Sequence, residues 1–471
     1  MRFILKNQLL FFVAIFVGTV LSAQPIAFPH AEGFGRFSVG GRGGDVYHVT
    51  TLDDYNPKTD KPLKGSLRFG MLSQEGPRTI IFDLSGTIRL KEELRGTKSY
   101  LTIAGQTAPG DGITLRDYTF KLTGEQGKPM HDVIIRFIRF RHGDVTKQSG
   151  DGLSTNWIND LILDHISAGW TIDCIHDLRD AARFTMQWSV FAEALNQSTH
   201  YKNGAHAMLS SYSHLYGNVS VHHNLMASSR NRHPTLGGGD RTDTTAVVDF
   251  RNNLVFNWAS GTNFGQCRHN LINNYYKPGE STDYKANKPL RMKSSRASSG
   301  VGYLSGNYFA GAPKEFNSDN YTAVDYNLYG TPAETNKYKG TSRAQWESKS
   351  PFVSGDDLPK TDSHETTYQI VLERAGASLV RDAVDKRVIA GVKDGTNRLI
   401  DSQIEVGGWP ELTTKPAPKD SDGDGMPDKW EIVNKLNSSD PADRNSHTLN
   451  KNFTNLEVYL NSLVEHLYKI Y

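Results

Sequence analysis

The sequence is poor in cysteine, in long hydrophobic runs and in net charge. Only Cys174 and Cys267 occur among 471 residues, which excludes a fold that depends on a disulfide framework. Beyond residue 23, no apolar run is long enough to cross a bilayer, so we expect no membrane span. The formal net charge is only +2, so bulk charge gives no reason to expect binding to nucleic acid or to a membrane surface. Any acidic ligand must therefore be recognised by local charges.

The first 23 residues have the pattern of a secretory signal peptide. Arg2 and Lys6 precede an apolar stretch at residues 9–20, and small residues follow it. No cysteine follows the apolar stretch, which argues against a bacterial lipid anchor. We expect a secreted protein, extracellular or periplasmic. Because this segment holds two positive charges, the mature chain is close to neutral.

Helical periodicity is scarce before about residue 310, where short apolar strands recur instead. The expected strands cover residues 79–84, 101–104, 133–140, 161–165, 184–190, 219–223, 246–250 and 267–270. The later ones begin roughly 20 to 35 residues apart, a spacing typical of solenoids. The pattern predicts an all-β parallel β-helix. A β-sandwich would need tight Asn-Gly or Asp-Gly hairpin turns, which are scarce between these strands.

Many of the expected strands end in asparagine, which tolerates left-handed turns and bonds to its own backbone. If equivalent turns stack on one another, these side chains could also bond to each other. They are Asn224, Asn252, Asn253, Asn270, Asn273, Asn274 and Asn307.

Past residue 310 the strand pattern weakens. Residues 321–351 show little periodicity, residues 370–392 have helical spacing, and residues 415–419 form a Pro/Lys linker. We therefore divide the mature chain into a β-helix domain at 24–414 and a small C-terminal extension at 415–471.

The extension carries the calcium-loop pattern of an EF-hand, in which oxygen ligands and glycines alternate at fixed spacing. We expect one structural calcium, bound by Asp420, Asp422, Asp424, Asp428 and Glu431 with the carbonyl of Met426. Residues 447–453 offer no carboxylates for a second loop. A capping box at 454–457 and a leucine stripe (Leu456, Leu460, Leu463 and Leu467) predict a terminal helix. We expect the calcium to order the loop and dock this helix, far from catalysis.

Acidic and basic side chains gather between residues 150 and 241. Asp173 and Asp177 are four residues apart, Lys202 follows His200 closely, and residues 219–239 join a strand to a polar turn containing Arg232. This arrangement suggests an active site for an acidic polymer, with a metal between like charges. Cys174 lies between the carboxylates, and we favour buried thiols over a Cys174–Cys267 disulfide.

Several segments together resemble polysaccharide lyase family 1, the secreted pectate lyases, especially those of Bacteroidetes-type bacteria. They are residues 31–36 (AEGFGR), 40–44 (GGRGG), 101–110 (LTIAGQTAPG), 163–165 (LDH) and 405–410 (EVGGWP). The resemblance covers most of the mature chain. It implies a right-handed parallel β-helix, calcium at the substrate site, and β-elimination of polygalacturonate that leaves 4,5-unsaturated uronate ends.

The resemblance also implies roles for individual residues. Arg232 in Arg232-His233-Pro234 corresponds to the catalytic base, and Lys202 to the lysine that holds the substrate carboxylate. Asp173 and Asp177 correspond to the acidic pair that binds calcium, and Asp151 to an earlier aspartate ligand. The family often has another arginine where this chain has Gly237. That substrate contact is either missing or supplied elsewhere, with Arg230 and Arg241 as the candidates. His200 and His233 are further expected substrate contacts.

Arginine is an unusual base, because its pKa normally exceeds about 12. Deprotonation would need nearby cations and alkaline pH, whereas a histidine base would act nearer neutrality. His200, His223 and His233 are the alternatives, and the resemblance favours Arg232. Asp164 and His165 are interpreted as structural, and at least one of His222 and His223 as a core residue. Asp173, Asp177 and Lys202 could also be ordinary surface charges.

The leading hypothesis is a calcium-dependent pectate lyase that acts on an acidic polysaccharide as a monomer. Another uronate polymer, such as glucuronan or rhamnogalacturonan, is a second hypothesis. A non-catalytic polysaccharide-binding β-helix is a third, although a pure binder has no need of a base. A glycoside hydrolase on this fold would need an acid/base carboxylate pair astride the bond.

Overall fold

The computed structural model describes residues 24–73, 75–200, 204–293, 300–329, 341–353 and 358–468. The expected signal peptide at 1–23 lies outside these residues. Within the described ranges, no helix combines the length and the apolar character needed to cross a bilayer.

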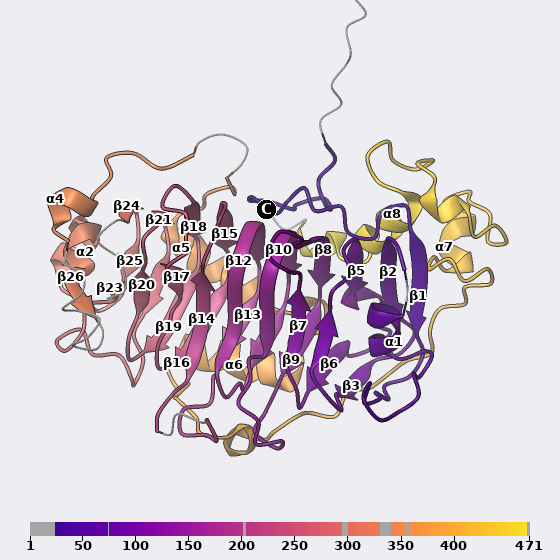
Figure 1. Ribbon diagram of the computed structural model, residues 1–471, viewed down its shortest axis with the longest axis horizontal. Helices are drawn as coiled ribbons and strands as arrows, with labels where there is room; N and C mark the ends of the chain where they lie inside the picture. The colour runs from indigo at the N-terminus through magenta and orange to yellow at the C-terminus, as the bar shows by residue number, and fades with distance from the viewer. Residues whose placement is uncertain are drawn as a thin grey trace, which may run out of the picture.

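Short parallel strands stack in three ladders that run the length of the molecule (Figure 1). The first ladder begins at the N-terminal end and pairs each strand with one from the next coil. Its strands are β1 (Asp45–Val49), β2 (Arg78–Phe82), β5 (Leu101–Ala104), β8 (Met130–Arg136), β10 (Leu153–Asp164), β12 (Cys174–Gln187), β15 (Val219–His222), β18 (Val247–Arg251), β21 (Arg268–Ile272) and β24 (Val301–Ser305).

The second ladder shares β10 and β12 with the first, because these two long strands continue through both. The bend within each strand is marked by residues with positive φ, Asp160 in β10 and Asp180 in β12. The other strands of the second ladder are β4 (Leu94–Gly96), β7 (Phe120–Thr123), β14 (Met208–Ser213), β17 (Thr235–Gly238), β20 (Thr262–Phe264), β23 (Leu290–Lys293) and β26 (Val324–Tyr329).

The third ladder is a separate sheet of nine strands, all parallel. Its strands are β3 (Gly86–Arg89), β6 (Ile113–Arg116), β9 (Ile138–Arg141), β11 (Ser167–Gly169), β13 (Val190–Ala192), β16 (Leu225–Ser229), β19 (Leu254–Trp258), β22 (Tyr275–Lys277) and β25 (Tyr308–Phe309). Three parallel ladders visited in turn by each coil make a parallel β-helix, which confirms the expected fold class.

Inward-facing side chains from all three ladders form one continuous core. Leu163 and Phe184 represent the first ladder in it, Leu122 and Leu236 the second, and Phe191 the third; all are fully or almost fully buried. Each coil buries its apolar face only against its neighbours, so stability accumulates along the stack.

The predicted stacking of asparagine side chains is confirmed for Asn224, Asn253, Asn274 and Asn307. The side chains of Asn252 and Asn273 instead donate to the Asp362 carbonyl, and that of Asn270 donates to Asp249 and the Phe352 carbonyl. A ladder of amide hydrogen bonds joins Asn224 to Asn253 (3.0 Å), Asn253 to Asn274 (3.0 Å), Asn274 to Asn307 (2.8 Å) and Asn307 to Asn320 (3.1 Å). In each pair, the Nδ2 group donates to Oδ1 of the next residue. The ladder satisfies buried polar groups at the turn that each coil repeats.

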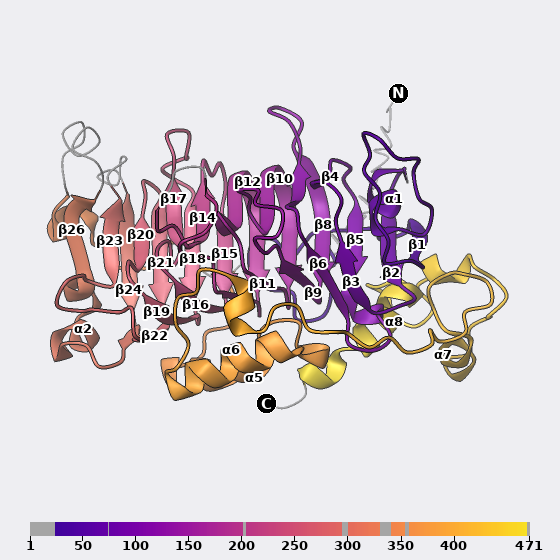
Figure 2. The same ribbon diagram turned by 90° about the horizontal axis from the view of Figure 1, so that it is seen from below.

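Helices cover parts of the solenoid. They are α1 (Leu67–Leu72), α2 (Lys314–Ser318), α4 (Arg343–Trp346), α5 (His364–Arg374), α6 (Ala383–Asp394), α7 (Asp428–Val433) and α8 (Asn455–Ser462). Short 3-10 turns are η1 (Gly105–Thr107), η3 (Asn320–Ala323), η4 (Ser378–Val380), η5 (Gln403–Val406), η6 (Asp443–Asn445) and η7 (Glu465–Leu467). Figure 2 shows α5 and α6 against the third ladder, where Val371 and Val388 pack on Leu225 and Phe256.

Two expectations for the C-terminal half need correction. Residues 321–351 are not simply loop, because β26 extends the second ladder and α4 packs Trp346 into the end of the core. The helical spacing at 370–392 belongs to two helices. The chain breaks between them at Gly376, whose φ is +85° and whose surroundings leave no room for a side chain: a Cβ there would lie 2.7 Å from Ser167 Oγ.

Candidate active site

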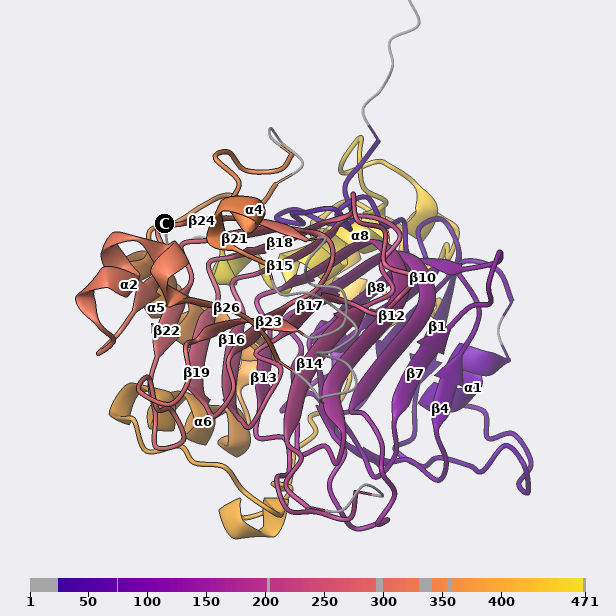
Figure 3. The same ribbon diagram turned by 60° about the vertical axis from the view of Figure 1, so that its left-hand side comes forward.

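Four side chains singled out in the sequence lie where the second ladder begins on neighbouring coils. Asp151 lies two residues before β10, Asp173 immediately before β12, Asp177 within β12, and Arg232 three residues before β17. Strands β10, β12, β14 and β17 are consecutive neighbours in this ladder (Figure 3). Parallel stacking therefore brings together residues that are up to 81 positions apart in the chain.

The three carboxylates repel one another. One oxygen each of Asp151 and Asp173 and the sulfur of Cys174 all lie within 4.8 Å of one another. Burial raises the pKa of Asp151 well above its usual range, and the charges of Asp177 and Asp173 raise it further. Burial also raises the pKa of Asp177, although Arg179 and Arg232 oppose the shift. Half-buried like charges of this kind are the arrangement that a bound divalent cation stabilises.

The donor set at this place fits calcium, which prefers carboxylate and carbonyl oxygens. Asp151 Oδ1 accepts a hydrogen bond from the Cys174 amide (3.1 Å), which fixes its orientation. Asp173 is held differently. Burial would raise its pKa, but a hydrogen bond from His206 and the charges of His206 and Arg232 lower the pKa of Asp173 to about 2. Asp173 is therefore ionised over a wide pH range.

Arg232 is held from two sides. Its Nη1 donates to the sulfur of Cys174 at 2.9 Å, and its backbone amide donates to Asn231 Oδ1 at 2.7 Å. Cys174 and Cys267 are free buried thiols, as the sequence interpretation favoured. Burial raises the pKa of Cys174 well above its usual range, so the thiol is protonated at neutral pH.

The negative groups around Arg232 keep it protonated. Charge on Cys174 would raise the pKa of Arg232 most, and Asp173 and Asp177 raise it further, against the lowering effect of burial. Because Cys174 is a neutral thiol at ordinary pH, the raised pKa of Arg232 is then due to the two carboxylates. Arg232 therefore loses its proton more readily when their charge is neutralised.

Two histidines lie beside Asp173. His206 Nε2 is 3.1 Å from Asp173 Oδ1, His200 Nε2 is 3.5 Å from Asp173 Oδ2, and the two rings stack with centroids 3.7 Å apart. His206 was not singled out in the sequence. Its approach to Asp173 depends on the path of the loop between β13 and β14, which no local pattern reveals.

None of the three histidines considered as alternative bases is open to a substrate, since His200 is itself only 3% exposed. His233 is fully buried, and burial lowers its pKa to about 3. His223 is also buried, 3.0 Å from Asp362 and stacked on Trp188 with centroids 4.3 Å apart. The structure therefore does not place His233 among groups that could contact a polymer at the surface.

Several cations proposed for substrate contact have different surroundings. Lys202 lies outside the described residues. Arg230 is exposed, whereas Arg241 forms an ion pair with Asp180 at 2.9 Å. A cation that the sequence interpretation missed is Arg179, which is exposed on β12 two residues after Asp177. Side chains two apart on a strand share a face, so this spacing was the available signal.

Gly237 explains why one expected arginine is absent. Its φ is +73°, and a Cβ there would lie 2.1 Å from the sulfur of Cys267. The register of β14 with β17 shifts at this point, so Ser213 pairs with Gly238. Arg179 pairs in turn with Ser213, which places Arg179 in the same lateral row as Gly238, two strands away.

Asp164 and His165 are structural, as interpreted. Asp164 is fully buried and accepts hydrogen bonds from Arg136 (2.7 Å) and Gln187 (2.8 Å). Burial alone would raise its pKa, but the charges of His165 and Arg136 lower it. The pair therefore belongs to the scaffold and not to the carboxylate group around Asp151. His222 and His223 are both buried.

The C-terminal loop forms a second acidic group. Asp420, Asp422 and Asp424 each place one oxygen within 4.8 Å of the others, and so do Asp424, Glu431 and Asp443. Asp443 was missed, because it lies beyond the loop motif. Asp428 turns away: it accepts from Lys419 Nζ (2.7 Å) and the Ser421 amide (2.7 Å). The Met426 side chain is buried in an apolar cluster.

Two curated proteins are similar to this chain over nearly its whole length. The chain is 33% identical over 454 residues to a probable pectate lyase C of Neosartorya fischeri, covering 94% of this chain and 95% of the relative. It is also 33% identical over 475 residues to a probable pectate lyase C of Aspergillus fumigatus, covering 98% and 99%. No protein-family profile matches the chain.

Among solved structures, the fold is similar to that of Jun a 1, the major allergen of cedar pollen. The TM-score is 0.51 at 17% sequence identity, over 74% of this chain and 92% of the allergen. This likeness concerns the fold alone and supports the parallel β-helix.

Proposed function

The chain belongs to the pectate lyase family, and on this premise we propose that it cleaves polygalacturonate by calcium-assisted β-elimination. The observation that carries the proposal is the group of repelling carboxylates, Asp151, Asp173 and Asp177, beside the guanidinium of Arg232. In this proposal they supply an acidic metal site and a base in one place, where the second ladder begins on stacked coils.

Elimination requires removal of the C5 proton of a uronic acid, which is a weak acid. In the proposed reaction, the C5–H bond breaks and the proton passes to Arg232. The electron pair forms the C4–C5 double bond, and the C4–O4 bond breaks with the leaving oxygen taking a proton from solvent. Calcium bound by the aspartates would supply positive charge that stabilises the negative charge developing on the substrate carboxylate.

The cations of the site have distinct roles in this proposal. Lys202 and Arg179 hold uronate carboxylates, and Arg230 contacts the chain further along. In this proposal Arg179 takes the part of the arginine that Gly237 excludes, because it is an exposed cation in the lateral row of Gly238, the residue next to Gly237. His200 and His206 orient Asp173. We leave His233 out of the substrate contacts, since its side chain is buried.

The same electrostatics predict alkaline activity. Asp173 and Asp177 hold the proton on Arg232, so the reactive, neutral guanidine forms only when cations offset their charge. We therefore expect turnover to rise with pH through the alkaline range in the presence of calcium. The sense of this dependence separates Arg232 from a histidine base, whose activity would level off near neutrality.

Two finer assignments belong to the same proposal. Residues 1–23 would direct the protein out of the cytoplasm, as pectate degradation requires. Membership of the Bacteroidetes-type branch rests on the same segments that carry the resemblance, residues 31–36, 40–44, 101–110, 163–165 and 405–410.

The test is incubation of the purified protein with separate uronate polymers, following the ultraviolet absorbance of unsaturated ends. We expect absorbance to rise with polygalacturonate, to stop on chelation and to return with added calcium. A response confined to glucuronan or rhamnogalacturonan would transfer the proposal to that polymer. No response with any uronate, while the same samples bind polygalacturonate, would replace the lyase by a polysaccharide-binding protein.

A further inference from the structure

The C-terminal acidic group contains carboxylate oxygens that are buried and lack any bonding partner. Glu431 is fully buried and Asp424 is 1% exposed. Both oxygens of Glu431, Oδ2 of Asp424 and Oδ1 of Asp443 have no hydrogen-bond partner among the described residues. A buried carboxylate without a partner is strongly destabilising, so its retention points to a bound cation.

The carboxylates are also crowded together. Asp420, Asp422 and Asp424 each place one oxygen within 4.8 Å of the others, and so do Asp424, Glu431 and Asp443. Like charges this close repel one another unless a cation lies among them.

We propose that Asp420, Asp422, Asp424, Glu431 and Asp443 bind one calcium ion, which fastens the C-terminal extension to the outer face of the first coils. The donors are all carboxylate oxygens, the ligands that calcium prefers. The two groups of three share Asp424, so one centre can serve both. Gly423 and Gly425, with φ of +73° and +92°, let the loop turn sharply around it.

The site differs from the loop expected from the sequence. Asp428 is engaged by Lys419 and Ser421 instead of facing the other carboxylates. Asp443, from η6, takes its place in the group. The proposed ion therefore joins two segments, the loop 420–431 and the turn at η6. A ligand from η6 completes the site, so that no second calcium loop is needed.

The joined segments lie directly on the solenoid. Met426 and Leu460 pack against Ile81 of β2 and Ala104 of β5, on the side of these strands that faces away from the core. A Cβ on Gly425 would lie 3.1 Å from Val46 of β1, so the loop is in close contact with the first strand. Figure 2 shows α7 and α8 beside β1 and β2.

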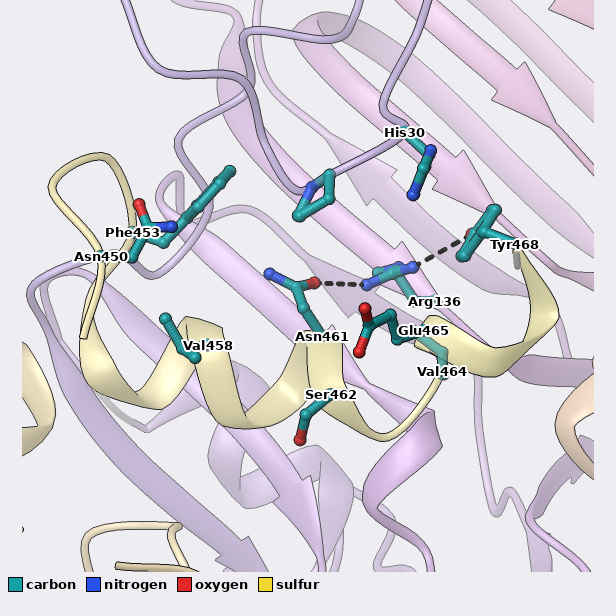
Figure 4. Close-up of a pocket in the computed structure, with 11 residues that line it drawn as sticks. His30, Arg136, Asn450, Phe453, Val458, Asn461, Ser462, Val464, Glu465 and Tyr468 are labelled. Carbon is teal, nitrogen blue, oxygen red and sulfur yellow. Dashed lines mark hydrogen bonds between the residues drawn. The ribbon is translucent and has the colours of Figure 1, made fainter. Parts of the chain in front are cut away.

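Polar contacts add to this attachment. His48 Nε2 lies 3.3 Å from the Gly423 carbonyl, and Arg42 Nε donates to Glu457 Oε1 at 2.8 Å. Further along, Arg136 donates to Asn461 Oδ1 at 3.1 Å, on one side of a cavity of about 230 Å³ between residues 29–30 and residues 450–468 (Figure 4). Calcium that orders the loop would therefore also order the C-terminal segments that pack on the outer face of β1, β2 and β5.

The test uses the full chain and compares Asp443→Asn with Asp428→Asn. Calorimetric titration with calcium and thermal melts with and without calcium are measured for both. We expect Asp443→Asn to weaken one calcium site by about tenfold or more and to lose most of the calcium-induced rise in melting temperature. Asp428→Asn should retain both. The reverse result, with Asp428 required and Asp443 dispensable, would overturn the proposal in favour of an ordinary calcium loop.

A second measurement needs no variant and guards against a misfolded one. In the wild-type protein, calcium should slow tryptic cleavage at Lys419 and Lys435 by about tenfold, while cleavage elsewhere changes less. Equal cleavage with and without calcium would refute the proposal that calcium fastens the C-terminal extension to the first coils. The outcome is independent of the proposed lyase function. Asp443→Asn should keep its calcium-dependent turnover per folded molecule. Failure of the lyase proposal would leave the C-terminal calcium site unaffected.

Discussion

Replacing Asp151 by asparagine should make the calcium-free protein more stable and the calcium-bound protein less so. The amide keeps the oxygen that accepts from the Cys174 amide at 3.1 Å and removes only the charge. In the wild-type protein, oxygens of Asp151 and Asp173 lie within 4.8 Å of each other. Two charges at that separation repel by about 3.5 kcal/mol at an effective dielectric constant of about 20.

The observable gain is smaller than this repulsion. The Asp173 side chain is 30% exposed, so solvent screens part of the interaction, and the substitution also removes the attraction of Asp151 to Arg232. We expect a net stabilisation of about 1 to 2 kcal/mol in chelator, seen as a rise in melting temperature on the order of 2 °C.

The raised pKa of Asp151 determines how its contribution to stability changes with pH. The folded-state pKa of Asp151 is raised above its unfolded value of about 3.9. Between those two pKa values the folded state binds more protons, so the stability that Asp151 contributes falls as pH rises. In chelator, the wild-type protein should lose more stability than Asp151→Asn between mildly acidic and alkaline pH.

The assay is a set of thermal melts of both proteins, with chelator and with calcium, across this pH range. The control is Asp53→Asn, at an exposed residue after β1. It should leave the melting temperature unchanged both in chelator and in calcium. If Asp151→Asn melts below the wild type in chelator, or if calcium stabilises it as much as the wild type, the carboxylates do not form a repelling metal site.

Three further substitutions test separate parts of the account. Arg232→Lys keeps the charge but loses the guanidinium, and should lower kcat by about 10² to 10⁴ while polygalacturonate binding persists; near wild-type rates would place the base elsewhere. Arg179→Ala should raise KM about tenfold through loss of a charged contact, with the melting temperature unchanged; an unaltered KM would remove Arg179 from the substrate contacts. Asn253→Ala breaks bonds to Asn224 and Asn274 and should cost about 1 to 3 kcal/mol of stability, seen as a lower melting temperature at constant turnover per folded molecule; an unshifted melt would show that the ladder is dispensable.

The fold was largely predictable, because its strongest signals are local. Strands expected at 101–104 and 219–223 agree with β5 and β15 within a residue, and the asparagines that end several coils form the predicted ladder. The expected strand at 133–140 is instead divided between β8 and β9 at Phe137, whose φ is +56°. The expected strands lie almost entirely in the first ladder, and the strands specific to the second and third ladders were largely missed, including β14, β16 and β19 with five or six residues.

The site was only partly predictable, because its missing members depend on contacts between coils. His206 meets Asp173 across 33 residues, and Asp443 joins Asp424 across two loops; neither distance leaves a pattern in the sequence. Arg179 could have been found from its spacing to Asp177. His233 was proposed from its place beside Arg232, yet alternation along the chain turns it into the interior.

The most direct test of the central claim is the mass of the products formed from polygalacturonate. Elimination leaves a 4,5-unsaturated sugar at each new non-reducing end, whereas hydrolysis adds one water across the cleaved bond. We predict that the new non-reducing ends are lighter than hydrolytic ends by one water and are formed only when calcium is present. Products whose non-reducing ends have the full hydrolytic mass would contradict the assignment of this site to β-elimination.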